Sequence, residues 1–138
     1  MSASEAILFA LSFAVPLVAF VSGRTPERLA ALIFALATLA TASAGHFWNY
    51  WQIGNLLLTI DGLMALSFLV LAIRYNYLWI ALLMGAMSGY FAVHAYYLMA
   101  HRQLDETFAL MSNLATSVAL LSIAIGVWTS RRRPAESN

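Results

Sequence analysis

The sequence predicts an all-α membrane protein, a compact bundle of about five transmembrane helices joined by short loops. Of its 138 residues, 62% are apolar and only 9% are charged. Soluble domains contain about 25% charged residues, so this composition favours a chain that lies in a bilayer. About 20 helical residues cross the roughly 30 Å of hydrocarbon in a bilayer. Apolar runs of about that length lie near residues 4–21, 27–47, 55–73, 77–100 and 107–128.

The first run, residues 4–21, is expected to remain in the mature protein. Its leader MSASE carries an acid and no basic residue, which is unlike a cleaved signal peptide. Pro16 lies in the middle of the run and lacks a backbone N–H, which predicts a kink. The following GRTPER then predicts that one helix ends at Gly23 and the next begins with Thr25 as its N-cap and Pro26 at its first position.

The other runs are separated by short polar connections. WNYWQIGN, residues 48–55, is poorly suited to face lipid, so it favours two helices over one long merged helix. RYNY and HRQLDET separate the later runs, and neither is long enough to build a separate catalytic domain. The sequence therefore predicts a single transmembrane domain over residues 1–130 and a basic tail over residues 131–138.

The distribution of arginine predicts the orientation of the helices. All seven basic residues are arginine, and six of them fall on one side of the predicted membrane: Arg24, Arg28, Arg74, Arg131, Arg132 and Arg133. Short loops rich in basic residues stay in the cytoplasm. We therefore expect the N-terminus outside and the C-terminus in the cytoplasm, with the outside being the periplasm if the membrane is a bacterial inner membrane. Two aromatic belts are predicted, with Trp48, Tyr50 and Trp51 outside and Tyr75, Tyr77, Trp79 and Trp128 inside.

The composition excludes several kinds of chemistry. A chain without lysine cannot form a Schiff base on a lysine, and one without cysteine has no disulfide, thiol redox or cysteine-ligated metal chemistry. The sequence has no glycine-rich phosphate loop after a strand and no serine nucleophile elbow. Its basic residues do not form a surface for nucleic acid. We expect a protein that is not an enzyme and does not bind nucleic acid.

Asp61 is the one carboxylate inside the third apolar run, in the stretch TIDGLM. An ionised side chain at that depth costs on the order of 3 kcal/mol on insertion scales, so an acid within a membrane span is a candidate for function. Polar neighbours must offset this cost. In antiparallel helices joined by short turns, residues equidistant from the turn lie at about the same depth, so the connections predict which residues are level with Asp61.

This comparison of depths predicts two polar layers in the outer half of the bundle. The shallower layer holds His46, His94 and Asn113, and the deeper one, about 5 Å further in, holds Asp61, Tyr90 and Ser117. We expect Tyr90, Ser117 and one or both histidines to form hydrogen bonds with Asp61 inside the bundle. Each polar residue other than Asp61 has a structural alternative, which is a hydrogen bond that merely holds two helices together.

Small residues predict close contacts between helices. The stretch GAMSG places Gly85 and Gly89 at the GxxxG spacing that lets helix backbones approach one another, and TASAG ends at Gly45. We expect Gly85, Gly89 and Gly45 to be packing positions. Their partner is either another helix of the same chain or a second protein in the membrane.

Three classes of function remain open. In the first, Asp61, His46 and His94 form an outward-facing polar pocket that binds or relays a proton, an ion or a small ligand. In the second, the protein is a non-catalytic accessory or scaffold subunit of a larger membrane complex, or associates with itself. In the third, His46 and His94 are the axial ligands of a b-type haem, or the two histidines and Asp61 bind a divalent metal. The first class requires no cofactor, and the lipid bilayer is a partner in all three.

Several segments carry a resemblance to a protein family. GRTPERLAAL, DGLMALSFLVLAIRYNYLWIALL, VHAYYL and GVWTSRRR resemble a group of small, uncharacterised bacterial inner-membrane proteins with several spans. That group has an Asp near the start of one span, Arg and Trp around the next turn, and a His late in the following span. Asp61, Arg74, Trp79 and His94 match this pattern. The resemblance implies a membrane protein and no particular activity.

Overall fold

The protein is an all-helical bundle, which confirms the predicted fold class. A computed structural model describes residues 3–47 and 50–132, with side chains for residues 6–44 and 54–132. The helices are α1 (Ala3–Ser22), α2 (Thr25–Phe47), α3 (Tyr50–Tyr75), α4 (Leu78–Met99) and α5 (Glu106–Arg132).

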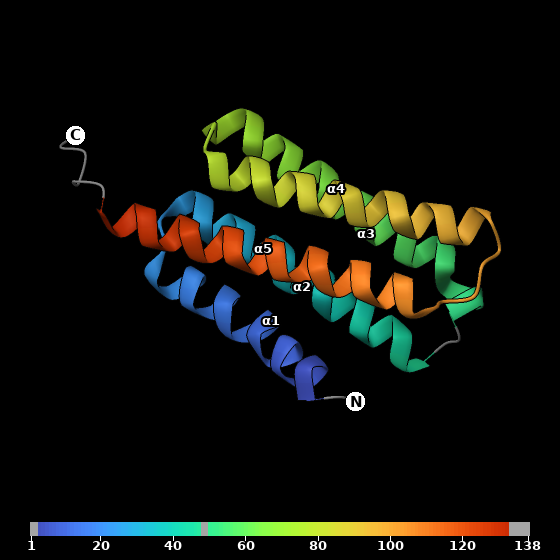
Figure 1. Ribbon diagram of the computed structural model, residues 1–138. Coiled ribbons are helices and arrows are strands. Elements are labelled where there is room, and N and C mark those ends of the chain that lie inside the picture. The colour runs from blue at the N-terminus through green and yellow to red at the C-terminus, as the bar shows by residue number, and fades with distance from the viewer. Residues whose placement is uncertain (1–2, 48–49, 133–138) are drawn as a thin grey trace.

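The five helices close into a ring. Each helix contacts the next along the chain, α1 contacts α5, and α2 also contacts α5 across the bundle. Consecutive helices are antiparallel, so α1 and α5 run in the same direction (Figure 1). We call the end at which α2 begins and α5 finishes the arginine end, because Arg24, Arg74 and Arg132 lie there, and the opposite end the loop end.

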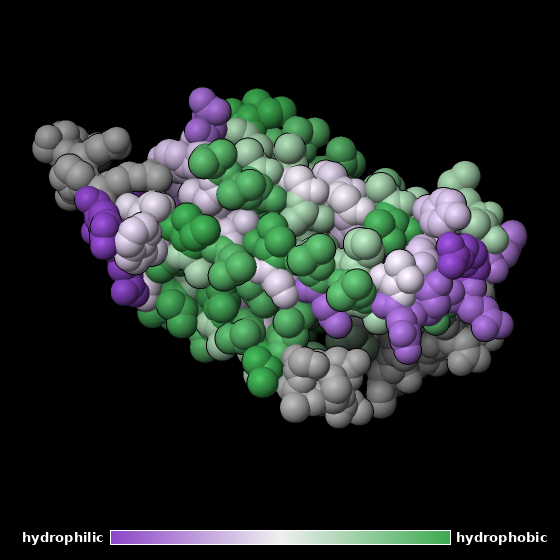
Figure 2. Space-filling view, in the orientation of Figure 1, coloured by the Kyte–Doolittle hydropathy of each residue, from purple (hydrophilic) through white to green (hydrophobic). Residues whose placement is uncertain are grey.

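Length and hydropathy identify a small multi-pass membrane protein. Four helices are long and apolar enough to span a bilayer, over Thr25–Ala44, Gly54–Tyr75, Leu78–Met99 and Glu106–Arg132. The described apolar part of α1, Ala6–Ser22, is shorter. Figure 2 shows apolar side chains over the middle of the bundle and hydrophilic side chains at both ends. An exposed apolar surface of this extent is covered by lipid rather than by water.

The first turn of α2 differs by one residue from the prediction. The backbone N–H of Arg24 donates to Glu27 Oε2 at 2.9 Å, and the N–H of Arg28 donates to the carbonyl of Arg24 at 2.9 Å. Arg24 therefore occupies the N-cap position that was predicted for Thr25. The reason is the glutamate three residues later, which reaches back to the N-cap N–H as in a capping box.

The connection between α2 and α3 is shorter than predicted. Helix α3 begins at Tyr50, so residues 50–54 of the predicted WNYWQIGN connection belong to the helix. The side chains of Trp48, Tyr50 and Trp51, predicted as the outer aromatic belt, lie outside the described residues.

Two turns fix how α3, α4 and α5 follow one another. After α3, Asn76 has a φ of 46° and its N–H bonds to the carbonyl of Ala72 at 2.9 Å. After α4, His101 has a φ of 50°, and the N–H of Arg102 bonds to the carbonyl of Tyr97 at 3.0 Å. Both are left-handed helix ends, in which backbone hydrogen bonds satisfy the last carbonyls of the helix. These ordered turns set the depths at which residues of neighbouring helices meet.

The main apolar core includes large side chains that are almost completely buried, among them Phe68, Ile80, Leu83 and Ile123. Trp79 belongs to this core with 3% of its surface exposed, so its predicted place in the inner aromatic belt is wrong. The reason is Gly126 of α5, whose missing side chain leaves the space that the Trp79 indole fills. Trp128, by contrast, is exposed at the arginine end, as a belt residue would be.

Candidate functional site

The structure brings Asp61 and His94 into direct contact inside the bundle. Asp61 of α3 and His94 of α4 are 4% and 2% exposed, and His94 Nδ1 lies 2.5 Å from Asp61 Oδ2. A buried carboxylate is tolerated when a hydrogen-bonded partner offsets the lost hydration. His94 is therefore a direct partner for the charge that the sequence places in an apolar helix.

Counting residues along α3 and α4 predicts that Asp61 and His94 differ in depth by about one helical turn, yet their side chains meet. In an α-helix the bond from Cα to Cβ tilts toward the N-terminus. Because α3 and α4 are antiparallel, the side chain of Asp61 leans toward the loop end and that of His94 leans toward the arginine end. The two side chains converge and close the gap between the predicted polar layers.

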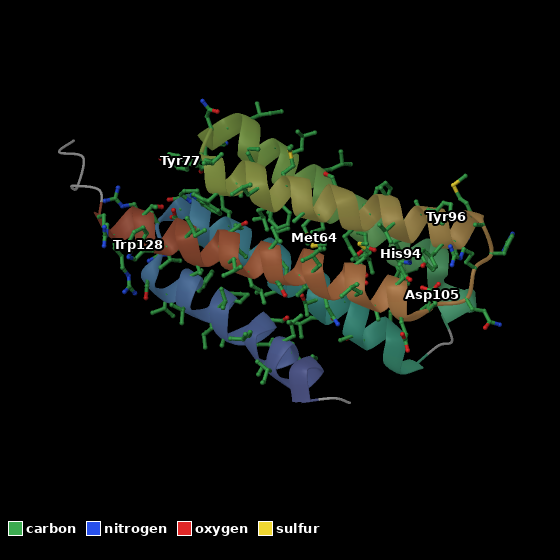
Figure 3. All side chains as sticks on the ribbon, viewed as in Figure 1. Met64, Tyr77, His94, Tyr96, Asp105 and Trp128 are labelled. Atoms are coloured by element: carbon green, nitrogen blue, oxygen red, sulfur yellow. The ribbon has the colours of Figure 1, made fainter. Side chains whose placement is uncertain are left out.

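Aromatic rings flank His94, with Tyr90 one turn deeper on α4 and Phe108 at the start of α5. The His94 ring centroid lies 6.0 Å from that of Tyr90 and 5.9 Å from that of Phe108, which approaches edge-on. Phe108 in turn lies 5.1 Å from the ring of Tyr97. In Figure 3, His94 lies between the helices, and Asp105 lies beyond it at the start of α5. Tyr97 and Phe108 lie on the loop-end side of the Asp61–His94 pair.

Asp105 holds this aromatic group in place by capping α5. Its Oδ1 accepts hydrogen bonds from the Tyr97 hydroxyl at 2.6 Å and from the Phe108 backbone N–H at 2.9 Å. Its Oδ2 accepts from Arg102 Nη2 at 2.8 Å. The hydrogen bond from Tyr97, then that from the Phe108 N–H, and the charge of Arg102 lower the pKa of Asp105 from its ordinary value.

Asp105→Ala is expected to lower the thermal stability at neutral pH, because it leaves the Tyr97 hydroxyl and the Phe108 N–H without their acceptor. The folded-state pKa is depressed, so the ionised carboxylate stabilises the fold above its unfolded pKa of about 3.9, and this contribution is lost as the pH falls through the folded pKa. Melting curves of both proteins between about pH 3 and 7 should therefore converge at the acidic end. A difference in melting temperature that is constant over this range would contradict the assignment.

Asp61 also lines a cavity of about 240 Å³ to which all five helices contribute. Its polar lining residues are Ser12, Thr38, Thr41, Asp61, Tyr90 and Thr116. The Ser12 hydroxyl donates to the carbonyl of Leu8 and the Thr38 hydroxyl to that of Phe34, each at 2.9 Å. Because these protons are used within their own helices, Ser12 and Thr38 offer oxygen lone pairs to other groups. Together with the carboxylate they make the lining rich in acceptors.

The structure keeps Tyr90 at this site and places Asn113 and Ser117 elsewhere. Tyr90 lines the cavity with Asp61, whereas Asn113 is exposed on α5. The Ser117 hydroxyl donates to the carbonyl of Asn113 at 2.7 Å, and Ser117 lines a groove between α1 and α5 instead. Its neighbour Thr116 faces the cavity, because one residue along a helix turns the side chain by about 100°.

Among the described residues, no other helix packs against Gly85 and Gly89. Both are exposed on α4, and a Cβ built on either would meet nothing within 4 Å. This placement does not fit the expected contact with another helix of the same chain. The side chain of His46 and the surroundings of Gly45 lie outside the described residues, so their predicted roles stay predictions.

The sequence predictions missed several lining residues. Ser12, Thr38, Thr41 and Thr116 face the cavity, and Phe108 covers His94, yet none was predicted as a site residue. Two features of the sequence could have indicated these residues. Thr38 and Thr41 are three residues apart and therefore share one face of a helix, and Thr116 is the neighbour of the predicted Ser117. Phe108 gave no signal, because an aromatic residue near the start of an apolar helix is common.

The structure adds no evidence for the predicted metal site or the predicted haem site. Within the described parts of the chain, no group of three or more His, Asp or Glu side chains is arranged to hold a metal ion. The predicted haem pair and the predicted metal site both require His46, whose side chain is not described.

The chain was also compared with known proteins. No family model, no curated protein and no solved structure matches it. The resemblance to small bacterial inner-membrane proteins therefore stays an expectation. The described residues form five helices, and four of these are long and apolar enough to span a membrane.

Proposed function

We propose that this membrane protein binds a small cation in the cavity beside Asp61, and that the Asp61–His94 pair releases a proton to solvent when the cation binds. The observation that carries the proposal is the position of Asp61, paired with the buried His94, on the wall of a cavity lined by all five helices. A buried acid and histidine that served only to hold two helices together would need no cavity beside them.

The chemistry of the lining favours a cation. Asp61 supplies a negative charge, and Ser12 and Thr38 supply oxygen lone pairs because their protons are donated to backbone carbonyls. Oxygen ligands and a carboxylate are what alkali cations and ammonium groups bind. The imidazole of His94, in contact with the Asp61 carboxylate, can hold or release a proton, so His94 provides the proton-exchanging partner. The proposed ligand is therefore a small monovalent cation, an alkali ion or an ammonium group, in competition with a proton.

The purified protein in detergent provides the test. Sodium, potassium and methylammonium chlorides are added in turn at constant ionic strength, while a pH-sensitive dye records protons released in weak buffer. We expect one of these cations to bind and to release protons, and we expect Thr38→Val to weaken that binding because it removes a lone pair at nearly constant shape. If no cation binds and no proton is exchanged, the proposal is wrong.

A role as an accessory subunit is the second candidate, and one observation favours it. Gly85 and Gly89 form a slim, exposed surface on α4 that nothing in the described chain covers. In membranes, such a surface allows close approach of a helix from another protein or from a second copy. This candidate needs neither a cavity nor a proton-exchanging pair.

Gly85→Leu tests this second candidate. Because space is open around Gly85, we expect the melting temperature of the isolated protein to remain unchanged while any complex or oligomer formed through α4 is lost. Blue-native electrophoresis of membranes solubilised in mild detergent measures the size of the assembly. Val70→Phe, which enlarges an exposed side chain on α3, serves as the matched control. An assembly of unchanged size in Gly85→Leu would remove this surface from consideration.

A further inference from the structure

A continuous apolar groove runs along the outside of the bundle between α1 and α5. Two hollows of about 280 and 350 Å³ lie between these helices and share the lining residues Val15 and Ala124. On α5 the groove extends from Ser117 to Arg131. Because α1 and α5 run in the same direction, the groove follows their axes.

The length of the groove is that of a lipid chain. Fourteen residues separate Ser117 from Arg131, which at about 1.5 Å per residue is about 21 Å. One leaflet contributes about half of the roughly 30 Å hydrocarbon core, or about 15 Å. The groove therefore has room for an extended acyl chain over the full depth of a leaflet.

The arginine end of the groove carries positive charge. Arg131 lines the groove beside Trp128, and the guanidinium of Arg132 lies 3.9 Å from the centre of the Trp128 ring. Figure 3 shows Trp128 near the end of α5, at the opposite end of the bundle from Asp105. Among the described side chains, those of residues 6–44 and 54–132, neither arginine has an ion pair with an acidic group. The apolar groove therefore ends beside two guanidinium groups that can bind a phosphate.

We infer that this groove is a binding site for an anionic phospholipid. One acyl chain lies between α1 and α5, and the headgroup phosphate contacts Arg131 and Arg132 beside the indole of Trp128. A second copy of the chain is a poorer occupant, because a two-fold contact through this groove would place Arg131 and Arg132 against the same arginines of the other copy. The site is independent of the Asp61 cavity and of the function proposed for it.

Fluorescence quenching of Trp128 tests the inference. The full-length protein is placed in nanodiscs of phosphatidylcholine that contain a small fraction of lipid with brominated acyl chains, either phosphatidylglycerol or phosphatidylcholine. Subtracting the signal of Trp128→Phe isolates the emission of Trp128. We expect stronger quenching by brominated phosphatidylglycerol than by brominated phosphatidylcholine at the same mole fraction, because the anionic lipid is enriched in the groove.

Two variants test the headgroup contact and the chain contact separately. Arg131→Gln should reduce the preference for phosphatidylglycerol about fivefold, the effect of one basic residue at a membrane surface. Ala124→Phe should reduce quenching by filling the groove at the point where its two hollows meet. The controls are Arg74→Gln at the same end of the bundle and Val70→Phe on the lipid-facing side of α3, and neither should change the quenching.

Four results would overturn the inference. Equal quenching of the wild type by the two brominated lipids would show that the site has no preference for an anionic headgroup. An unchanged preference in Arg131→Gln, or unchanged quenching in Ala124→Phe, would place the lipid elsewhere. Since the chain has no cysteine, a disulfide-linked dimer of Ala124→Cys in native membranes would show that a second copy occupies the groove instead.

Discussion

Asp61→Asn is expected to abolish cation binding and the associated proton release while the helical bundle stays folded. Asparagine keeps the shape of the side chain and an oxygen that can accept a hydrogen bond from His94, but it removes the charge. Removing a buried charge also removes its desolvation cost, so we expect the free energy of unfolding to change by no more than about 1 kcal/mol. Binding is measured by calorimetry and stability by melting curves between about pH 5 and 8.

A second variant separates the roles of the two partners. In His94→Asn the side-chain amide can still donate a hydrogen bond to Asp61, but no imidazole remains to exchange a proton. We expect cation binding to persist in this variant and its dependence on pH between about 5 and 8 to disappear. If Asp61→Asn is as stable as the wild type and loses no binding, the pair is structural and the accessory-subunit hypothesis becomes the better one.

Gly126→Ala is expected to destabilise the bundle strongly for so small a change. A Cβ at this position would lie 2.8 Å from two atoms of the Trp79 indole, which is 3% exposed in the core and rigid. Overfilling a well-packed core costs about 1 to 3 kcal/mol, since side chains must leave their preferred rotamers. Unfolding in increasing amounts of sodium dodecyl sulfate, followed by circular dichroism, measures the loss.

Gly89→Ala is the matched control for this prediction. It makes the same chemical change inside a helix, but in open space, so we expect the stability to stay the same or rise by up to about 1 kcal/mol, because alanine favours a helix over glycine. Combining Gly126→Ala with Trp79→Phe should restore part of the stability, because the smaller ring makes room for the added methyl group. Equal stabilities of the two glycine variants would mean that the contact between α4 and α5 does not depend on Gly126.

The sequence by itself determined the helices and the class of protein. Apolar runs and turn residues act locally, so the five helices begin and end within a few residues of their predicted limits, except at Tyr50. Asp61 could be singled out for the same reason, because a charge inside an apolar run is visible without any knowledge of its neighbours. The predicted orientation rests on the arginines and stays a prediction.

The tertiary structure alone decided which polar side chains meet. Depth along a helix follows from counting residues, but the rotation of each helix about its axis depends on how side chains from several helices pack together. A rotation of about 100° separates Thr116, which faces the cavity, from Ser117, which does not. The tilt of side chains toward the N-terminus of each helix brought His94 to Asp61 from a different predicted layer. Trp79, which was predicted for the surface belt, likewise lies in the core because its indole packs against Gly126.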